Sequence, residues 1–168
     1  MPINPSIAER RAFPRPDTFD VNESDDLAVY DGGQRPTMAL VGRLLIASIF
    51  LMSGISKLTD LPGTVAHMTE AGIPYAQTLA TVAGIAEVMG ALSLIAGLLT
   101  RVGSAGLILF MIPATLIFHA FWNFEGKERM PQMLNFMKNL AIIGGLAGFV
   151  AFGAGRFSLD HKLRRSRR

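Results

Sequence analysis

The residues of this sequence best suited to chemistry are ionisable side chains placed inside long apolar stretches. Glu87, His119 and Lys138 each interrupt such a stretch, and Arg43 interrupts another. Carboxyl, imidazole and amine groups exchange protons, and a low-dielectric environment can bring that exchange closer to neutral pH. We therefore take these positions as candidates for proton exchange or for binding a polar group.

The neighbours of Glu87 indicate where it points. The residues three and four positions away on a helix are Ala83, Gly84, Gly90 and Ala91, all of them small. Small residues allow helices to approach closely within a membrane. We therefore expect Glu87 to face the interior of a helical bundle.

We expect one cavity to bring the polar groups of several helices together. Its predicted lining is Glu87, His119, Asn123, Lys138 and Asn139. An alternative stays open, in which Glu87 only forms an internal ion pair with Arg43 or Lys138. Arg43, Ala47, Phe50, Gly54 and Lys57 share one helix face, and we interpret Lys57 as a headgroup anchor at a helix end.

Four apolar segments predict the fold. They run over residues 37–57, 77–99, 102–122 and 134–153, close to the roughly 20 residues that a membrane span requires. A soluble four-helix bundle would need a charged face on each helix, and the third segment has none. The prediction is an all-α integral membrane four-helix bundle with antiparallel, up-and-down spans.

Composition excludes several classes of site. The 168 residues are 50% hydrophobic and 17% charged, and they include no cysteine. Disulfides, thiol nucleophiles and cysteine-ligated metals are therefore excluded. The histidines lie in separate segments, so no metal site is expected.

The ends of the chain differ from its middle. We expect residues 1–36 to be a flexible cytoplasmic tail, residues 37–155 to be the four-span domain, and residues 156–168 to be a basic cytoplasmic tail. Beside a membrane span, such a basic run favours contact with lipid headgroups over nucleic acid. Arg101 and the basic tail on one side outweigh Lys57, Lys127 and Arg129 on the other, which predicts cytoplasmic termini.

The order of these motifs resembles the DoxX family of small four-helix bacterial membrane proteins over residues 37–161. The first span reads GRLLIASIFLMSGISKL and the second GIAEVMGALSLIAGLLTR. The third ends in IFHAFW, and the fourth, MLNFMKNLAIIGGLAGF, is followed by GAGRFSLD. The polar positions that match are Arg43, Lys57, Glu87, His119, Lys138, Asn139, Ser158 and Asp160.

The resemblance implies a multi-pass protein of the bacterial inner membrane. Some family members are similar to a subunit of thiosulfate:quinone oxidoreductase, and others look like membrane partners of oxidative-stress and thiol-handling enzymes. The absence of cysteine departs from any scheme in which this chain cycles a disulfide.

Our leading hypothesis from the sequence is therefore a membrane subunit or quinone-site component of a redox system. Glu87, His119 and Lys138 would act on a quinone head group, without a covalently bound cofactor. Arg43, Lys57, Asn123 and Asn139 would contact the bound quinone. Two alternatives are a non-enzymatic scaffold that recruits soluble partners through its tails and a small transporter.

Overall fold

The computed structural model describes residues 35–166 of the chain, and this part is helical without strands. The predicted tail over residues 1–36 lies outside the described residues up to residue 34, and so do residues 167–168. The four long helices are α2 (Arg35–Thr59), α4 (Ala76–Ala96), α5 (Thr100–Phe118) and α6 (Gly126–Phe152). The short ones are α3 (Leu61–Glu70), η3 (Phe121–Asn123) and α7 (Leu159–Ser166).

The predicted all-α membrane bundle is confirmed. In the described part of the chain, 4 helical segments are long and apolar enough to cross a membrane. Large apolar side chains project outward along them, as a lipid environment requires. Examples are Met52, Val82, Met89, Leu109 and Leu140.

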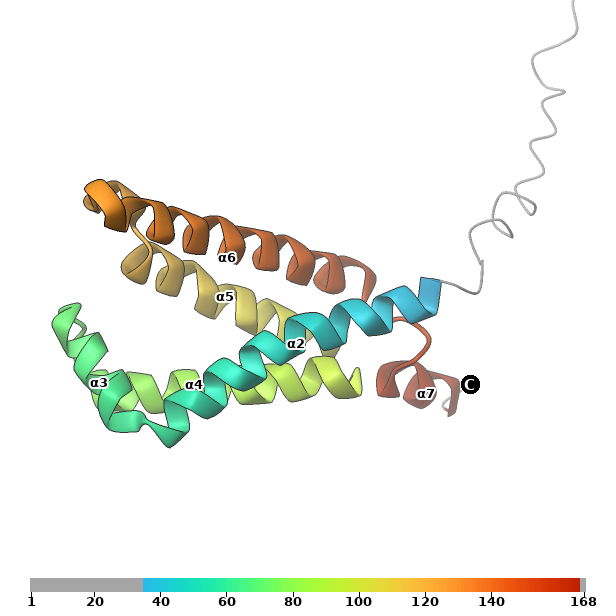
Figure 1. Ribbon diagram of the computed structural model, residues 1–168. Helices are drawn as coiled ribbons and strands as arrows, with labels where there is room; N and C mark the ends of the chain where they lie inside the picture. The colour runs from blue at the N-terminus through green and yellow to red at the C-terminus, as the bar shows by residue number, and fades with distance from the viewer. Residues whose placement is uncertain (1–34, 167–168) are drawn as a thin grey trace, which may run out of the picture. The chain divides into compact units, whose positions relative to one another are not determined.

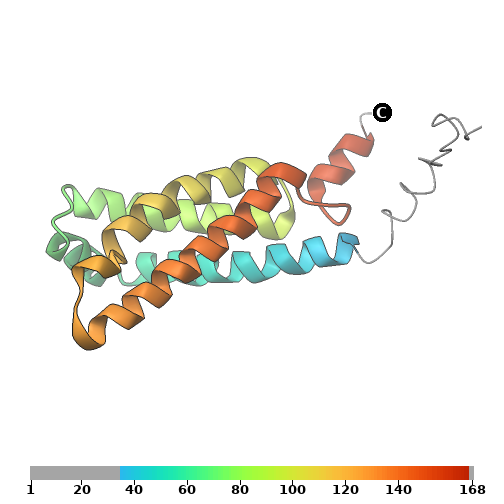
Figure 2. The same ribbon diagram turned by 90° about the horizontal axis from the view of Figure 1, so that it is seen from above.

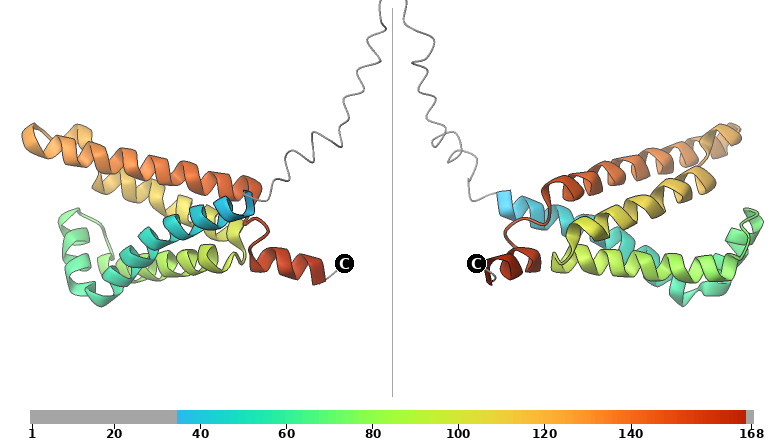
Figure 3. Two further views of the ribbon diagram at one scale, coloured as in Figure 1. Left: turned by 45° about the vertical axis from the view of Figure 1, so that its right-hand side comes forward. Right: turned by 180° about the vertical axis from the view of Figure 1, so that it is seen from behind.

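The four long helices form two antiparallel pairs, α2 with α4 and α5 with α6 (Figure 1). The pairs come together where α4 turns into α5 and diverge toward α3 and η3, as two further views also show (Figure 3). We call these the closed end and the open end of the bundle. Seen from above, α6 crosses the bundle obliquely, and the chain then turns back into α7 at the closed end (Figure 2).

Two glycines let α2 and α4 pack closely. A Cβ atom added at Gly54 would lie 2.8 Å from the backbone oxygen of Gly84 and 2.8 Å from a methyl group of Val88. A Cβ atom added at Gly84 would lie 2.8 Å from the side chain of Leu58. Glycine at these positions therefore sets the close spacing of this pair.

Arg43 holds the closed end together. Its side chain is 0% exposed and donates hydrogen bonds to the carbonyl oxygens of Leu94, in the last turn of α4, and Phe157, after α6. A cation is favoured at a helix C-terminus, where carbonyl groups lack intrahelical partners. Arg43 therefore ties α2 to α4 and to the C-terminal segment; it does not reach Glu87, and it is not among the residues that line the cavity around Glu87.

Asp160 completes the closed end from α7. Its carboxylate accepts hydrogen bonds from the backbone N–H groups of Leu99 (2.9 Å) and Thr100 (3.1 Å), at the N-terminus of α5. Its own N–H donates to the carbonyl oxygen of Gly97 at 2.9 Å. Leu99 cannot cap α5 with its side chain, so a residue distant in sequence supplies the acceptor.

The structure also moves two predicted boundaries. Helix α2 begins at Arg35, inside the predicted tail, and α6 begins at Gly126 instead of residue 134. Within the predicted basic tail, residues 159–166 form α7. Polar residues extend α6 beyond the apolar stretch, since a helix can continue past the hydrocarbon layer.

We predict that Gly97→Ala destabilises the protein while Gly144→Ala does not. Gly97 has a φ of +64°, and an added Cβ would collide with the guanidinium of Arg43 and with Ser158. The left-handed backbone alone costs an alanine about 1–2 kcal/mol. The apparent melting temperature in detergent should fall for Gly97→Ala. It should hold or rise for Gly144→Ala, because nothing lies within 4 Å of a Cβ there.

We also predict that Asp160→Ala lowers the stability by about 0.5–2 kcal/mol, the usual effect of losing a helix cap. Asp160→Asn keeps one acceptor oxygen and should lose less. The matched control is Lys162→Ala, an exposed position on the same helix. Equal melting temperatures for the alanine variant and the unchanged protein would refute this role of Asp160.

Candidate functional site

Glu87 forms an ion pair with Lys57 near the middle of α4. The Lys57 Nζ atom lies 3.1 Å and 3.0 Å from the two carboxylate oxygens, and it also donates to Ser53 Oγ at 2.6 Å. Glu87 is 3% exposed and Lys57 is 28% exposed. A charge buried within a membrane bundle requires such a partner.

The direction of the side chains explains this pairing. In a helix, every Cα–Cβ bond tilts toward the helix N-terminus. Because α2 and α4 are antiparallel, Lys57 on α2 leans toward the closed end and Glu87 on α4 leans toward the open end. The two side chains thus meet near the contact between Gly54 and Gly84.

Two interpretations from the sequence are therefore wrong. Lys57 is not a free headgroup anchor, and the partner of Glu87 is neither Arg43 nor Lys138. Lys138 instead donates to Asn135 Oδ1, one turn earlier on α6, at 3.0 Å. Because the Lys138 ammonium already has this hydrogen-bond acceptor on its own helix, it does not need to reach the carboxylate of Glu87 on α4.

The ion pair lies on the wall of a cavity of about 350 Å³ between the two helix pairs. All four long helices and α3 contribute to it. Its apolar lining includes Phe50, Phe110, Met111, Phe118 and Ile142. Its polar lining is Ser53, Lys57, Thr64, His67, Glu87, His119, Lys138 and Asn139.

His119 reaches this cavity from the end of α5, where it is the C-cap residue. Its Nδ1 atom lies 2.8 Å from Gln132 Oε1 on α6. An amide oxygen only accepts hydrogen bonds, so Nδ1 carries a proton in this contact. In the neutral ring, Nε2 is then the nitrogen that can take up a proton.

Asn139 also lines the cavity and is fixed by a contact between helices. Its Nδ2 atom donates to Thr115 Oγ1 on α5 at 3.0 Å. This hydrogen bond leaves the amide oxygen of Asn139 without a partner among the described residues. Asn139 therefore lines the cavity as predicted, and its amide oxygen can accept a hydrogen bond from a ligand.

Asn123 does not line the cavity, contrary to expectation. The prediction assumes that Thr115, His119 and Asn123 continue one helix face. Helix α5 ends at Phe118, and Asn123 lies exposed in η3. The break at His119 ends the helical spacing on which the prediction depends.

His67 is one of three polar residues of the cavity wall that the sequence analysis did not single out; the others are Ser53 and Thr64. His67 lies on α3 and stacks on Phe118, with ring centroids 5.2 Å apart and an interplanar angle of 22°. A signal for α3 exists: Asp60 caps it by accepting from Gly63 N–H at 3.1 Å, and Pro62 follows the cap. This capping pattern marks a helix start and places His67 on a helix instead of in a loop.

The donor set suits a polar organic group better than a metal ion. No group of three or more His, Asp or Glu side chains within the described residues is arranged to hold a metal. The cavity instead presents an ammonium, a carboxylate, an imidazole and an amide around an apolar space. Such a set binds and orients a polar head with an apolar body.

Comparison with known proteins agrees with this architecture. The DoxX family model matches residues 38–120. Inner membrane protein YphA of Escherichia coli (strain K12) is 31% identical over 131 residues, covering 78% of this chain and 94% of YphA. Inner membrane protein YqjF of the same organism is 33% identical over 125 residues, covering 74% and 90%.

A mycobacterial protein is also similar to this chain. The uncharacterized membrane protein Rv3486 of Mycobacterium tuberculosis (strain ATCC 25618 / H37Rv) is 30% identical over 137 residues, covering 76% of this chain and 82% of that protein. No solved structure matches the chain. The four apolar helices, the family match and these full-length relatives together show that this chain is an integral membrane protein of the DoxX family.

Proposed function

We propose that this protein binds a quinone head group in the cavity between its helix pairs and serves as the quinone-site component of a membrane redox system. One observation carries the proposal: the Lys57–Glu87 pair, His119 and Asn139 converge on a single apolar cavity. Ligand pockets of this kind combine apolar walls with a few placed polar groups.

The size and lining of the cavity suit a quinone ring. A volume of about 350 Å³ lies within the range of small-molecule sites, roughly 300–1,000 Å³. Phe50, Phe110 and Phe118 offer flat apolar surfaces to a ring. Lys57 on α2, Lys138 on α6 and the protonated ring of His119 after α5 can donate hydrogen bonds to the oxygen atoms of that ring.

A bound quinone supplies an acceptor for two electrons and two protons, and the electrons come from a partner reductase in this proposal. Lys57 donates a hydrogen bond to one oxygen of the head group and can give it a proton. Glu87 stabilises the Lys57 ammonium and orients it. His119, held through Nδ1 by Gln132, exchanges the second proton through Nε2.

The orientation of the chain belongs to the same proposal. Arg101, Lys162, Arg164 and Arg165 lie at the closed end, whereas Lys127 and Arg129 start α6 at the open end. The excess of lysine and arginine favours a cytoplasmic closed end. The cavity then lies in the outer half of the membrane.

We predict that the double variant Glu87→Gln/His119→Ala weakens the binding of ubiquinone-1 by at least about tenfold. Losing a charge-assisted hydrogen bond costs about 1.5–3 kcal/mol, which is roughly 10- to 100-fold in affinity. Isothermal titration calorimetry of the protein in detergent measures this, together with the quinone content of the purified protein.

Two controls separate binding from folding. Lys127→Gln, an exposed change outside the cavity, should leave the affinity unchanged. The melting temperature of the double variant should fall, because Glu87→Gln leaves the Lys57 ammonium without its carboxylate; affinities are therefore compared at a temperature where circular dichroism shows both proteins to be folded. Unchanged ubiquinone-1 affinity in a folded double variant would refute the quinone site.

We predict that thiol labelling of introduced cysteines will show which end of the bundle faces the cytoplasm. The chain has no cysteine of its own, so only the introduced thiol can react. Glu128→Cys at the open end should react with a membrane-impermeant maleimide in spheroplasts, and Lys162→Cys at the closed end should react only after lysis. The reverse pattern would place the termini outside.

A further inference from the structure

A second cavity lies at the closed end of the bundle. Its volume is about 440 Å³, and it is bordered by the start of α5, the segment after α6, and α7. None of its lining residues also lines the cavity around Glu87. An inference about it is therefore independent of the proposed quinone chemistry.

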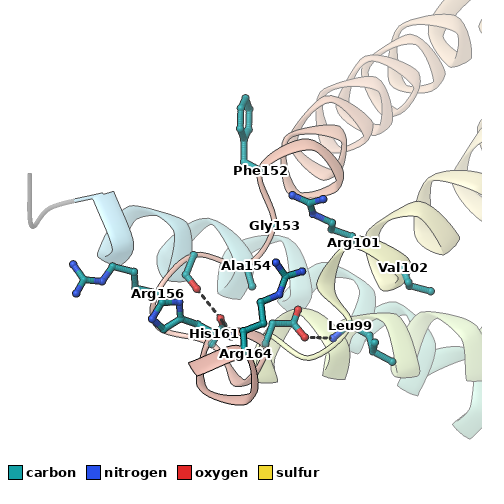
Figure 4. Close-up of a pocket in the computed structure, with 12 residues that line it drawn as sticks. Leu99, Arg101, Val102, Phe152, Gly153, Ala154, Arg156, His161 and Arg164 are labelled. Atoms are coloured by element: carbon teal, nitrogen blue, oxygen red, sulfur yellow. Dashed lines mark hydrogen bonds between the residues drawn. The ribbon is translucent and has the colours of Figure 1, made fainter. Parts of the chain in front are cut away.

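Two arginines from different helices meet at this cavity. Arg101 on α5 and Arg164 on α7 point their guanidinium groups into the same space beside Gly153 and Ala154 (Figure 4). Arg101 is steadied by donating to the carbonyl oxygen of Ala151 at 3.1 Å. Within residues 35–166, Arg164 makes no hydrogen bond or ion pair, so its donors are available to a ligand.

The one carboxylate in the lining of this cavity offsets one positive charge, but it forms no ion pair with Arg101 or Arg164 in the described part of the chain. Asp160 also lines the cavity, but its two oxygens accept from the backbone N–H groups of Leu99 and Thr100. Arg156 and His161 add further basic groups to the lining. With one acid against three arginines in its lining, the cavity is cationic, and the guanidinium groups of Arg101 and Arg164 suit an anion with several oxygen atoms.

Apolar surface lies directly beside these cations. Phe152, the last residue of α6, is 88% exposed, and Val102 in the first turn of α5 is 68% exposed. Both lie at the ends of membrane-spanning segments, where the hydrocarbon layer gives way to the polar interface. Leu159 and Leu163 on α7 are also exposed, so this helix presents both apolar and basic side chains.

We propose that the cavity binds the headgroup of an anionic glycerophospholipid. The phosphate lies between Arg101 and Arg164, and the acyl chains run along Val102 and Phe152. A soluble phosphate would use the arginines but not the apolar side chains beside them. The combination of a cationic cavity and an apolar rim at the end of a span is what favours a lipid.

Occupancy of this cavity stabilises the closed end. The lipid bridges α5 and α7, the two helices that the Asp160 contacts already join. A ligand that binds only the folded state raises its stability in proportion to the logarithm of ligand concentration. Phosphatidylglycerol should therefore raise the melting temperature of the protein, and phosphatidylcholine should raise it less.

The test is a lipid titration of the purified protein in mild detergent, followed by native mass spectrometry. Phosphatidylglycerol should bind more tightly than phosphatidylcholine. The variant Arg164→Glu should weaken phosphatidylglycerol binding by about tenfold. One cation near an anionic lipid raises its affinity several-fold, and a charge reversal both removes that attraction and adds a repulsion. Arg164 makes no contact that holds the described fold, so this variant should remain folded.

The matched control is Arg129→Glu, the same charge reversal at an exposed position of the open end. It should leave phosphatidylglycerol affinity unchanged. The proposal is overturned if Arg164→Glu binds phosphatidylglycerol like the unchanged protein, or if both variants lose affinity equally. It is also overturned if soluble glycerophosphoglycerol displaces the lipid at equal concentration, because the ligand would then be a free phosphoester.

Discussion

The structure depends on the burial of one guanidinium group. Arg43 is 0% exposed, and among the described residues no carboxylate forms an ion pair with it, although Asp160 lies near enough to attract it; it donates to the backbone carbonyl oxygens of Leu94 and Phe157. Removing a charge from water is costly unless its hydrogen bonds are made. The free-energy cost of burying Arg43 is therefore offset only while α2, α4 and the C-terminal segment remain in contact. This requirement holds the helices together at the closed end.

In the turn between α4 and α5, the two helix ends are each stabilised by a side chain of opposite charge to the helix dipole. Arg43 lies at the C-terminus of α4, where the helix dipole is negative, and Asp160 lies at the N-terminus of α5, where it is positive. The turn between the helices leaves these backbone groups without intrahelical partners. With this end held, the helix pairs can diverge at the other end and leave room for a cavity.

The sequence alone was sufficient for much of this architecture. The four spans follow from their length and hydropathy, and the buried position of Glu87 follows from Ala83, Gly84, Gly90 and Ala91. The shared face from Arg43 to Lys57 is likewise confirmed, since Arg43, Ala47, Phe50 and Gly54 are all buried. These features depend on spacing within one helix, which a sequence contains.

The partners of the charged residues could not be predicted in the same way. Whether Glu87 meets Arg43, Lys57 or Lys138 depends on the vertical offset between helices, which no spacing within one helix defines. His67 escaped notice because α3 is too short to span a membrane. Asn123 was misplaced because the prediction assumes one continuous helix, whereas α5 ends at Phe118, five residues after Pro113.

The two ends of the bundle are connected through a single face of α4. Glu87, Ala91 and Leu94 are buried on that face, so the helix that presents an acceptor to Arg43 also presents the carboxylate to Lys57. On α2, Arg43 and Lys57 lie on one face in the same way. Because both contacts join the same two helices, sliding α2 along α4 would disturb them together. The position of the Lys57–Glu87 ion pair is therefore set by the closed end as well as by its own geometry.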